Sequence, residues 1–515
     1  MRTKAVILLL GFLLAGCTKL GPDFKKPPQP PLPKSFHASH PFAKQTVAAW
    51  WTLFDDKALN RLIQLAASQN LDIRSAGLRI LQARAALGIA EGYRYPQKQT
   101  VSGGYLTNYD KGHIDALNLT FDTLWEMDIW GKYAREVESA RAVYMASVAG
   151  YRAATVAVLA ETARQYIAFR TAQERLAYAR RNAAIEKRVV KMTKIRFLAG
   201  SVSELDWQQA QTQWHNTLSA IPAMRTACVA ARNALALLLA VTPEEITRIV
   251  GPIEPSTEKR PCADTPAFVP LPKLNPQTLL DARLLLQRPD VIAAEHMAHS
   301  AAAKIGAEKA KLYPSFTLLG SIGYQATDRN PVFRNWTGWG SLSNNIILSA
   351  GPGLSWNIFQ YDRVKNSIRL QDALLQERLL AYTKTLIRAA TEADTAWRSY
   401  RLALAQLQER QKALKATERA FALSALQYKE GLVSYQRLLS TVEKLTLTRD
   451  IYAQLKGSTA QTLIFLFKAL GGGWQITRNR SFLHPADRKA LRSRGVAWGR
   501  RLDANQTRLP EGVDR

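Results

Sequence analysis

Few residues of this sequence have the types and spacing that chemistry on a substrate requires. His296 and His299 lie three residues apart on an expected helix, beside Met297, and could begin a metal site. No cysteine or carboxylate cluster in the sequence completes that site, so we expect no metal. The glycine run at 471–473 lacks the Lys-Ser/Thr of a phosphate loop. Without a His-Glu-x-x-His or nucleophile-elbow motif, we expect neither an enzyme nor a cofactor.

One position near the N-terminus is suited to covalent modification. A basic start precedes an apolar run at 5–14, which is too short to span a membrane but fits a signal-peptide core. The run Leu-Ala-Gly-Cys at 14–17 resembles a bacterial lipobox, in which Cys17 is lipidated and becomes the mature N-terminus. The alternative is an ordinary export signal with a chance cysteine. Because Thr18 replaces the aspartate associated with inner-membrane retention, the lipobox resemblance points to the outer membrane.

The remaining two of the three cysteines are Cys228 and Cys262. Three cysteines exclude a disulfide-dense scaffold. An export compartment permits a bridge between Cys228 and Cys262, but the sequence gives no geometry for the pair. A disulfide and two separate thiols therefore both stay open.

The amino-acid composition limits the classes of protein to which this chain can belong. The 515 residues are 47% hydrophobic, which is enough for a substantial core. Seventy Lys and Arg against 41 Asp and Glu give a net charge of +29. Such charge is typical of nucleic-acid binding, but an exported chain rarely meets DNA, so we expect solvated charge and no nucleic-acid partner. After the N-terminus we find no apolar run near the ~18–20 residues of a membrane helix, so we exclude a polytopic helical protein but not a β-barrel.

The sequence contains two copies of one pattern. Four residues recur 218 positions later, namely Asp72, Ala76, Gly88 and Pro96. Four more recur 231 positions later, namely Trp125, Gly200, Val202 and Ser203. One longer loop in the second copy, between Pro314 and Trp356, would account for the change of offset. Internal repetition of this kind predicts two structural repeats.

Each copy is expected to contain an opening helix and then a pair of strands. The first opening helix is expected over about 56–93. Apolar and polar residues alternate at about 99–130 and 315–361, which is the strand period. A soluble half-buried sheet and a membrane barrel would look alike. If the strands are membranous, several chains must share one barrel, because small transmembrane barrels need roughly eight or more strands.

A long helical hairpin follows in each copy. No proline interrupts the sequence from Gly131 to Gly200 or from Asp362 to Gly431, and each stretch could extend roughly 100 Å as a helix. Residues spaced by four and three form a coiled-coil seam in the second stretch: Leu386, Ala390, Ala393, Trp397, Tyr400, Leu404 and Leu407. Both helices are expected to break at the glycine, which tolerates a left-handed turn, and to return as antiparallel partners.

Together these features resemble the TolC-like outer-membrane efflux proteins, in the lipoprotein branch that serves resistance-nodulation-division multidrug pumps. The resemblance covers about residues 17–474. The motifs that carry it are the lipobox at Cys17, Gly-Pro-Asp-Phe at 21–24, Trp-Trp at 50–51, Trp-Glu-Met-Asp-Ile-Trp-Gly at 125–131, Arg-Pro-Asp at 288–290, both glycine turns, and Ala-Leu-Gly-Gly-Gly-Trp at 469–474. Single motifs are modest, but their order and spacing are specific.

The resemblance implies a mainly helical fold with a membrane β-barrel. Three protomers would share a 12-stranded barrel that a periplasmic α-helical barrel continues. The implied homotrimer is a lipid-anchored, passive exit duct in the outer membrane for small molecules such as drugs or toxic compounds. Its implied partners are outer-membrane lipid, a periplasmic membrane-fusion adaptor, and an inner-membrane pump, with the resistance-nodulation-division type favoured.

The two tips are implied to meet the adaptor. The expected contact residues are Gly200, Ser201, Val202, Ser203, Gly431, Leu432, Val433 and Ser434. Small residues permit close backbone approach, and an exposed Leu432 or Val433 could dock in a groove. A plain helix–turn–helix with a glycine and a capping serine would also explain these residues.

The expected periplasmic gate departs from the family pattern. Many members place an aspartate six or nine residues after the second tip glycine, where three copies close the tunnel. Here those positions hold Arg437 and Ser440, whereas the first copy has Asp206. Our hypothesis is a closed-state polar ring of Arg437 and Asp206, and the alternative is a solvated Arg437 outside the constriction. Tyr428 matches a tyrosine often found in this gate region, or else packs the turn.

These expectations divide the chain as follows: a signal peptide at 1–16, a lipid-anchored Pro-rich linker at 17–49, a first repeat at 50–250 with its hairpin at 132–242, a Pro-rich linker at 251–276, a second repeat at 277–474 with its hairpin at 362–471, and a basic, disordered tail at 475–515. Two rival functions stay open. One is a duct for type I protein secretion, and the other is a non-conducting coiled-coil lipoprotein spacer.

Overall fold

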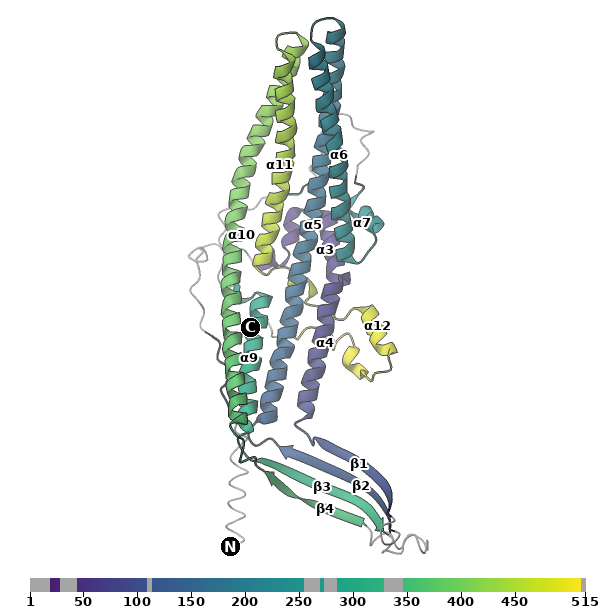
Figure 1. Ribbon diagram of the computed structural model, residues 1–515, viewed down its shortest axis with the longest axis vertical. Helices are drawn as coiled ribbons and strands as arrows, with labels where there is room; N and C mark the ends of the chain where they lie inside the picture. The colour runs from purple at the N-terminus through teal and green to yellow at the C-terminus, as the bar shows by residue number, and fades with distance from the viewer. Residues whose placement is uncertain are drawn as a thin grey trace. The chain divides into compact units, whose positions relative to one another are not determined.

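The computed structural model describes residues 19–27, 44–108, 114–253, 269–272, 285–327 and 346–510. Within them the chain is mainly helical and has one four-stranded sheet (Figure 1). The chain divides into two compact units, the first made of residues 1–29, 79–148 and 292–384, and the second of the remainder. Cys17 and Cys262 lie outside the described residues.

The sheet belongs to the first unit. It contains β1 (Lys98–Asn108), β2 (Ile114–Met127), β3 (Ser315–Thr327) and β4 (Ile346–Ser355), each antiparallel to the next. Residues 109–113 separate β1 from β2 and residues 328–345 separate β3 from β4. The change of repeat offset therefore falls between β3 and β4.

The two repeats make one equivalent contact beside the sheet. Trp125 donates its indole N–H to the carbonyl of Arg94 at 3.2 Å, and Trp356 donates to the carbonyl of Leu312 at 3.0 Å. The tryptophans match at one repeat offset and the acceptors at the other. Each bond links the indole ring to the chain just beyond the helix that precedes the strand pair.

Two pairs of long helices are joined by the tip turns. The first pair is α5 (Lys132–Leu198) with α6 (Glu204–Leu239), and the second is α10 (Arg363–Lys429) with α11 (Tyr435–Ala469) (Figure 1). The expected seam of the second hairpin is buried from Leu386 to Tyr400. Only α5 among single described helices is apolar and long enough to cross a membrane, and 56% of its most apolar window is buried, as in a helix packed within a bundle.

The opening helix of the first repeat is two helices, α3 (Lys57–Gln69) and α4 (Leu71–Gly92), and the expectation of one helix at 56–93 is wrong. Asn70 causes the break. Its side-chain oxygen accepts the N–H groups of Asp72 and Ile73 at 2.8 and 3.0 Å, which caps α4, while its amide donates to Leu238 O. Asparagine competes with the helix ladder in this way because its side chain satisfies the backbone locally.

Four further elements lie outside the sheet and the long hairpins. They are α2 (Lys44–Ala48), the short turn η2 (Trp50–Phe54), α7 (Pro243–Val250) and α9 (Pro289–Ala310). Trp50 is 1% exposed and stacks on Phe467 of α11, with 5.8 Å between ring centroids. Asp56 caps α3 and also accepts the Tyr166 hydroxyl at 2.5 Å, so the Trp-Trp motif region is tied to α5.

The expectation of a disordered tail is wrong for residues 475–510. This segment forms η6 (Trp474–Thr477), α12 (Pro485–Ser493) and η7 (Gly499–Leu502), with α12 drawn in yellow in Figure 1. Four apolar side chains are buried: Phe482, Leu483, Leu502 and Leu509. The composition suggested disorder because charge dominates it, but a few apolar residues suffice where the rest of the chain supplies a surface to pack on.

Candidate functional site

Both hairpin tips close with the same backbone motif. Gly200 has φ +71° and Gly431 has φ +79°, a region that side chains with a Cβ rarely enter. Ser201 N–H donates to Arg196 O and Leu432 N–H donates to Gln427 O, at 2.8 and 2.9 Å. Each glycine N–H also reaches the carbonyl three residues earlier. These paired bonds define Schellman caps, which satisfy the last carbonyls of α5 and α10.

The returning helices start differently in the two tips. Ser203 and Asp206 form a reciprocal capping box, with both side-chain-to-backbone distances 3.3 Å. Ser434 holds the equivalent cap position without a side-chain cap bond. Asp206 is therefore engaged at the start of its own helix in the single chain.

The other predicted gate residues do not gather at one point. Arg437 and Ser440 are exposed on α11, and the Ser440 hydroxyl donates to Arg437 O at 3.0 Å. Among the described ion pairs, none joins Arg437 to Asp206. Tyr428, by contrast, is 1% exposed and packs edge-on against Tyr435 at 6.0 Å. Its hydroxyl donates to Thr193 at 3.4 Å, so within the single chain it is a packing residue between α10 and α5.

Arg196 is a contact residue that sequence reasoning missed. Its guanidinium donates to the carbonyl of Tyr428 and lies 4.8 Å from the centre of the Tyr428 ring. Arg196 sits in the last turn of α5, so this cation joins the first hairpin tip to the second. A cation in the last turn of a helix also faces the negative end of the helix dipole. The position of Arg196 at the end of a helix can be read from the sequence, but the sequence does not show that Tyr428 is its partner.

Apolar side chains project from the tips. Leu198 and Leu432 are 73% and 75% exposed, and Leu205 is exposed as well. Gly200 and Ser201 are also exposed, whereas Val202 and Val433 are half-buried. Isolated exposed leucines are ordinary, but here three surround two open glycine turns.

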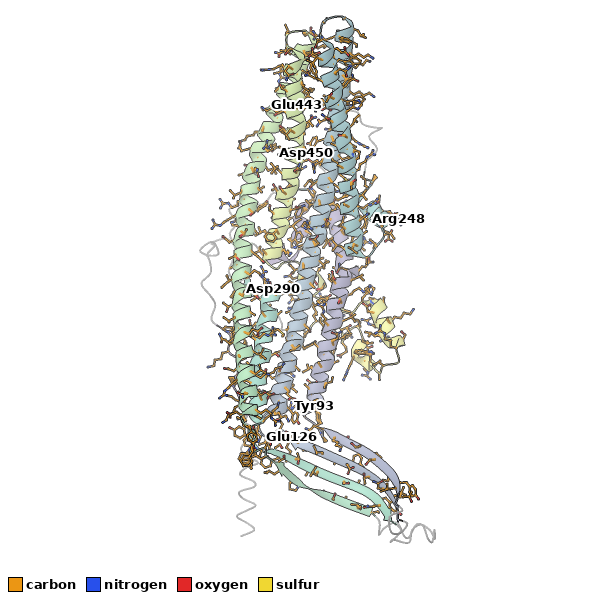
Figure 2. The ribbon with its side chains drawn as sticks, in the orientation of Figure 1. Tyr93, Glu126, Arg248, Asp290, Glu443 and Asp450 are labelled. Carbon is orange, nitrogen blue, oxygen red and sulfur yellow. The ribbon has the colours of Figure 1, made fainter. Side chains whose placement is uncertain are left out.

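Ion pairs connect the hairpins away from the tips. Arg175 of α5 binds Asp450 of α11 through two bonds of 2.6 and 3.2 Å; Asp450 is labelled in Figure 2. Lys456 of α11 lies 3.1 Å from Glu174, and both side chains are nearly buried. Glu174 also accepts Val269 N–H at 3.2 Å, which holds part of the linker between the repeats.

The Arg-Pro-Asp motif joins the start of α9 to the end of α11. Arg288 is 6% exposed, binds Asp290 at 2.9 Å and Glu392 at 3.0 Å, and donates to Ala469 O. Burial alone would raise the pKa of Asp290, but the hydrogen bond and charge of Arg288 hold it below its ordinary value. Asp290 is labelled in Figure 2.

Residues 19–24 form a docked segment, here called the anchor segment, just after the predicted lipidation site. Arg135 of α5 is 1% exposed and holds this segment. It donates to Leu20 O at 3.0 Å, to Gly21 O at 3.2 Å and to the Asp23 carboxylate at 2.8 Å. This explains the Gly-Pro-Asp-Phe motif, since Gly21 has φ +89° and Asp23 is an Arg135 partner.

A second layer supports the anchor segment. Gly306 of α9 leaves room for it, because a Cβ there would meet Leu20 O at 2.4 Å. Glu138 binds Arg135 at 2.9 Å and lies 3.1 Å from His299 Nε2, and His299 stacks on Phe24. Although burial opposes it, the His299 hydrogen bond lowers the pKa of Glu138. His299, a candidate metal ligand by its sequence spacing, thus contacts the anchor segment through Phe24, and the described residues contain no cluster suited to a metal.

The sheet has one apolar and one polar row running across all four strands. Register places Val101, Phe121, Ile322 and Leu348 side by side, and they are 70, 43, 51 and 76% exposed. The neighbouring row on the opposite face is Thr100, Asp122, Ser321 and Ser349. Ser321 donates to Asp122 at 2.7 Å. The apolar row of the sheet is therefore exposed in the single chain.

Residues 62–241 and 281–472 match the Outer membrane efflux protein family, and the chain belongs to that family. It is an outer-membrane efflux channel with its helical tunnel in the periplasm.

Two curated proteins and one solved structure illustrate the similarity. The probable outer membrane lipoprotein SilC of Salmonella typhimurium is 28% identical over 90% of this chain and 97% of its own. The cation efflux system protein CusC of Escherichia coli K12 is 27% identical over 91% and 99%. The solved outer-membrane channel OprN is 26% identical, with a TM-score of 0.77 over 89% of this chain and all of its own.

Proposed function

We propose that three copies of this chain form one continuous exit duct through the outer membrane and into the periplasm. The observation that carries this proposal is the four-stranded amphipathic sheet with its exposed apolar row. Three such sheets supply twelve strands, within the range of closed transmembrane barrels, in which apolar residues face lipid and polar residues face the lumen. The row of Val101, Phe121, Ile322 and Leu348 faces lipid, and the row that includes Asp122 and Ser321 faces the lumen.

The long hairpins of the three copies continue the duct as a helical tunnel. The periplasmic membrane-fusion adaptor contacts their tips at Gly200–Ser203 and Gly431–Ser434. Support comes from the exposed Leu198, Leu205 and Leu432, which give an apolar surface around two turns whose glycines allow close backbone approach.

Photo-crosslinking in living cells tests tip docking. A crosslinking residue is placed at Ser201 or Leu432, and a matched control is placed at exposed Lys415 on α10. We expect an adaptor to be captured at the tips and not at the control, together with a proton-driven pump. Capture of an ATP-driven exporter would favour type I secretion. Capture of only lipoproteins or cell-wall-associated partners would favour the spacer.

The duct carries small molecules such as drugs or toxic compounds, and the pump selects among them. CusC, a relative over nearly its full length, is named for cation efflux, so metal cations are the second candidate cargo. Conductance in planar bilayers separates a duct from a spacer. The trimer is expected to conduct once its tips are relaxed, whereas a spacer would never conduct.

The closed state is proposed to contain a polar ring near the tips. Three Arg437 side chains in a narrow tunnel would repel one another, unless each pairs with Asp206 or Glu204 of a neighbouring protomer. The exposure of Arg437 leaves it available for such a pair. Tyr428 packs behind the ring, and Ser440 lies one turn along α11. If Arg437→Ala and Asp206→Ala leave resting conductance and antibiotic uptake unchanged, the ring is excluded.

Cys17 is proposed to carry the lipid anchor, and Cys228 to pair with Cys262. The anchor segment supports lipidation at Cys17, because the chain is held in place from Lys19 onward, two residues after Cys17. Radiolabelled palmitate should enter the wild-type protein and not Cys17→Ser.

The proposed disulfide joins Cys228, which is buried on α6, to Cys262. Thiol counting under denaturing, non-reducing conditions distinguishes this disulfide from two separate thiols. The repeats are proposed to span 50–250 and 277–474, joined by 251–276.

A further inference from the structure

The C-terminal segment at 475–510, here called the appendage, lies beyond the part of the chain that matches the family. The family match ends at residue 472, whereas the described chain continues to residue 510. An isolated β-bridge joins Ser481 to Arg508, and Thr507 O accepts Phe482 N–H at 2.9 Å, so the segment closes on itself. The appendage is thus a small folded addition to the efflux channel.

The appendage is fixed to α4 by two contacts. Arg74 binds Asp487 through two parallel bonds of 2.9 and 2.6 Å, the bidentate geometry that is strongest for this pair. Gly77 lies directly beneath Phe482, because a Cβ at Gly77 would meet Phe482 O at 2.2 Å. The appendage therefore presents a defined outer surface.

That surface is cationic. The appendage contains nine Lys and Arg residues against two acidic ones. Asp487 is bound to Arg74 and Asp503 to Arg492 at 3.1 Å. Eight of the nine basic side chains are exposed: Arg478, Arg480, Lys489, Arg492, Arg494, Arg500, Arg501 and Arg508. Both of its acids are therefore engaged, and the exposed excess is positive.

One stretch of the appendage, from the end of α12 into η7, contains both cations and an aromatic ring. Residues 494–501 include Arg494, Arg500 and Arg501, the half-buried Trp498, and Val496, which is 60% exposed. Gly495 and Gly499 have φ +72° and +52°, and a Cβ at either would have nothing within 4 Å. Arginine forks bind carboxylates, and an indole face packs against the apolar face of a sugar ring.

We propose that the appendage binds peptidoglycan, with its arginines on the peptide carboxylates and Trp498 on the glycan. Peptidoglycan is the polymer of the periplasm that offers both carboxylates and sugar rings. A phospholipid surface offers anionic groups without sugar rings. The proposal requires the periplasmic tunnel of the family and is independent of adaptor docking at the tips.

Co-sedimentation of the full detergent-solubilised trimer with purified peptidoglycan sacculi tests this. The wild type should sediment with sacculi, and Arg494→Gln, Arg500→Gln and Arg501→Gln combined should reduce the bound fraction at least about fivefold. Trp498→Ala alone should reduce it about two- to threefold. Removing three exposed cations of α10, as Arg401→Gln, Lys415→Gln and Arg419→Gln, is the matched control and should leave binding unchanged.

Two further probes identify the chemistry. Sacculi with amidated carboxylates should lose binding, and raising the salt concentration from 50 to 500 mM should weaken it. Equal sedimentation of the triple appendage variant and the wild type would overturn the proposal. Capture by phosphatidylglycerol vesicles but not by sacculi would also overturn it and would assign the surface to lipid. The arginine and lysine substitutions are at exposed positions and Trp498 is half-buried, so each variant is compared as a trimer with wild-type conductance.

Discussion

At the scale of single residues, two arginines make contacts that the surrounding sequence does not predict. Arg196 joins the two tips through the carbonyl and ring of Tyr428. Arg135 binds the anchor segment within the first unit, through Leu20 O and the Asp23 carboxylate. Both use the planar fork of the guanidinium, which lysine cannot reproduce.

Replacing Arg196 should loosen the closed tips. Arg196→Ala removes both the bond to Tyr428 O and the cation–π contact, the latter worth about 0.5–2 kcal/mol. We expect higher resting conductance in bilayers and greater uptake of a large antibiotic by cells. Lys191→Ala, which removes an exposed cation five residues earlier on α5, is the control and should behave as wild type. Identical conductance of both variants would show that Arg196 does not restrain the tips.

Replacing Arg135 should release the anchor segment. Arg135→Met removes the cation that Asp23, Glu138 and two carbonyls of the anchor segment share, and because the Asp23 side chain is 86% exposed, the effect should fall on docking of the segment and not on global stability. Limited proteolysis should then cut near residues 19–27, and Arg135→Lys should restore part of the protection. A protease pattern equal to wild type would contradict the proposed clamp.

At the scale of elements, the Arg288 cluster ties α9 to the end of α11, and it predicts a dependence on pH. The folded pKa of Asp290 is lowered, so its contribution to stability is fully present above its unfolded pKa of about 3.9 and is lost as pH falls through the folded value. The thermal midpoint of the wild type should therefore drop below about pH 4.

A matched variant tests whether Asp290 itself causes this pH dependence of the thermal midpoint. Asp290→Asn keeps the shape of the side chain but removes its charge, so its midpoint should be lower at pH 7 and should fall less between pH 5 and pH 2. Melting followed by circular dichroism measures both. Parallel curves for the two proteins would mean that other carboxylates cause the acid sensitivity.

At the scale of the whole molecule, the proposed barrel requires the exposed apolar row of the sheet to face lipid. Leu348 and Ser349 are neighbours on β4 that point to opposite faces. Leu348→Asp should hinder stable insertion, because a charge on the lipid face of a barrel is destabilising, by up to about 2–4 kcal/mol per chain for Arg or Lys and by less for Asp. Ser349→Asp, one residue along, should be tolerated in the lumen. Membrane fractionation and trimer yield measure the difference, and equal yields would exclude a lipid-facing apolar row.

The family could be recognised from the sequence because the features that define it are local or periodic. The glycine turns at 200 and 431, the strand alternation and the coiled-coil seam each follow from backbone geometry over a few residues, so they could be recognised without coordinates. The break at Asn70 was missed because the apolar period continues across it, and only the cap bonds to Asp72 and Ile73 reveal it.

Contacts between distant segments were decided by tertiary structure alone. The anchor-segment partners of Arg135 and the Tyr428 partner of Arg196 lie more than a hundred residues away in sequence, and a single arginine gives no indication of which carbonyl it will meet. The folded appendage is the clearest case. Its charge predicted disorder, but Gly77 and Arg74 supply the surface and the ion pair that order it. Local pattern therefore determined the elements and the family of this protein, whereas the burial of specific polar groups, which depends on long-range packing, decided how those elements are tied together.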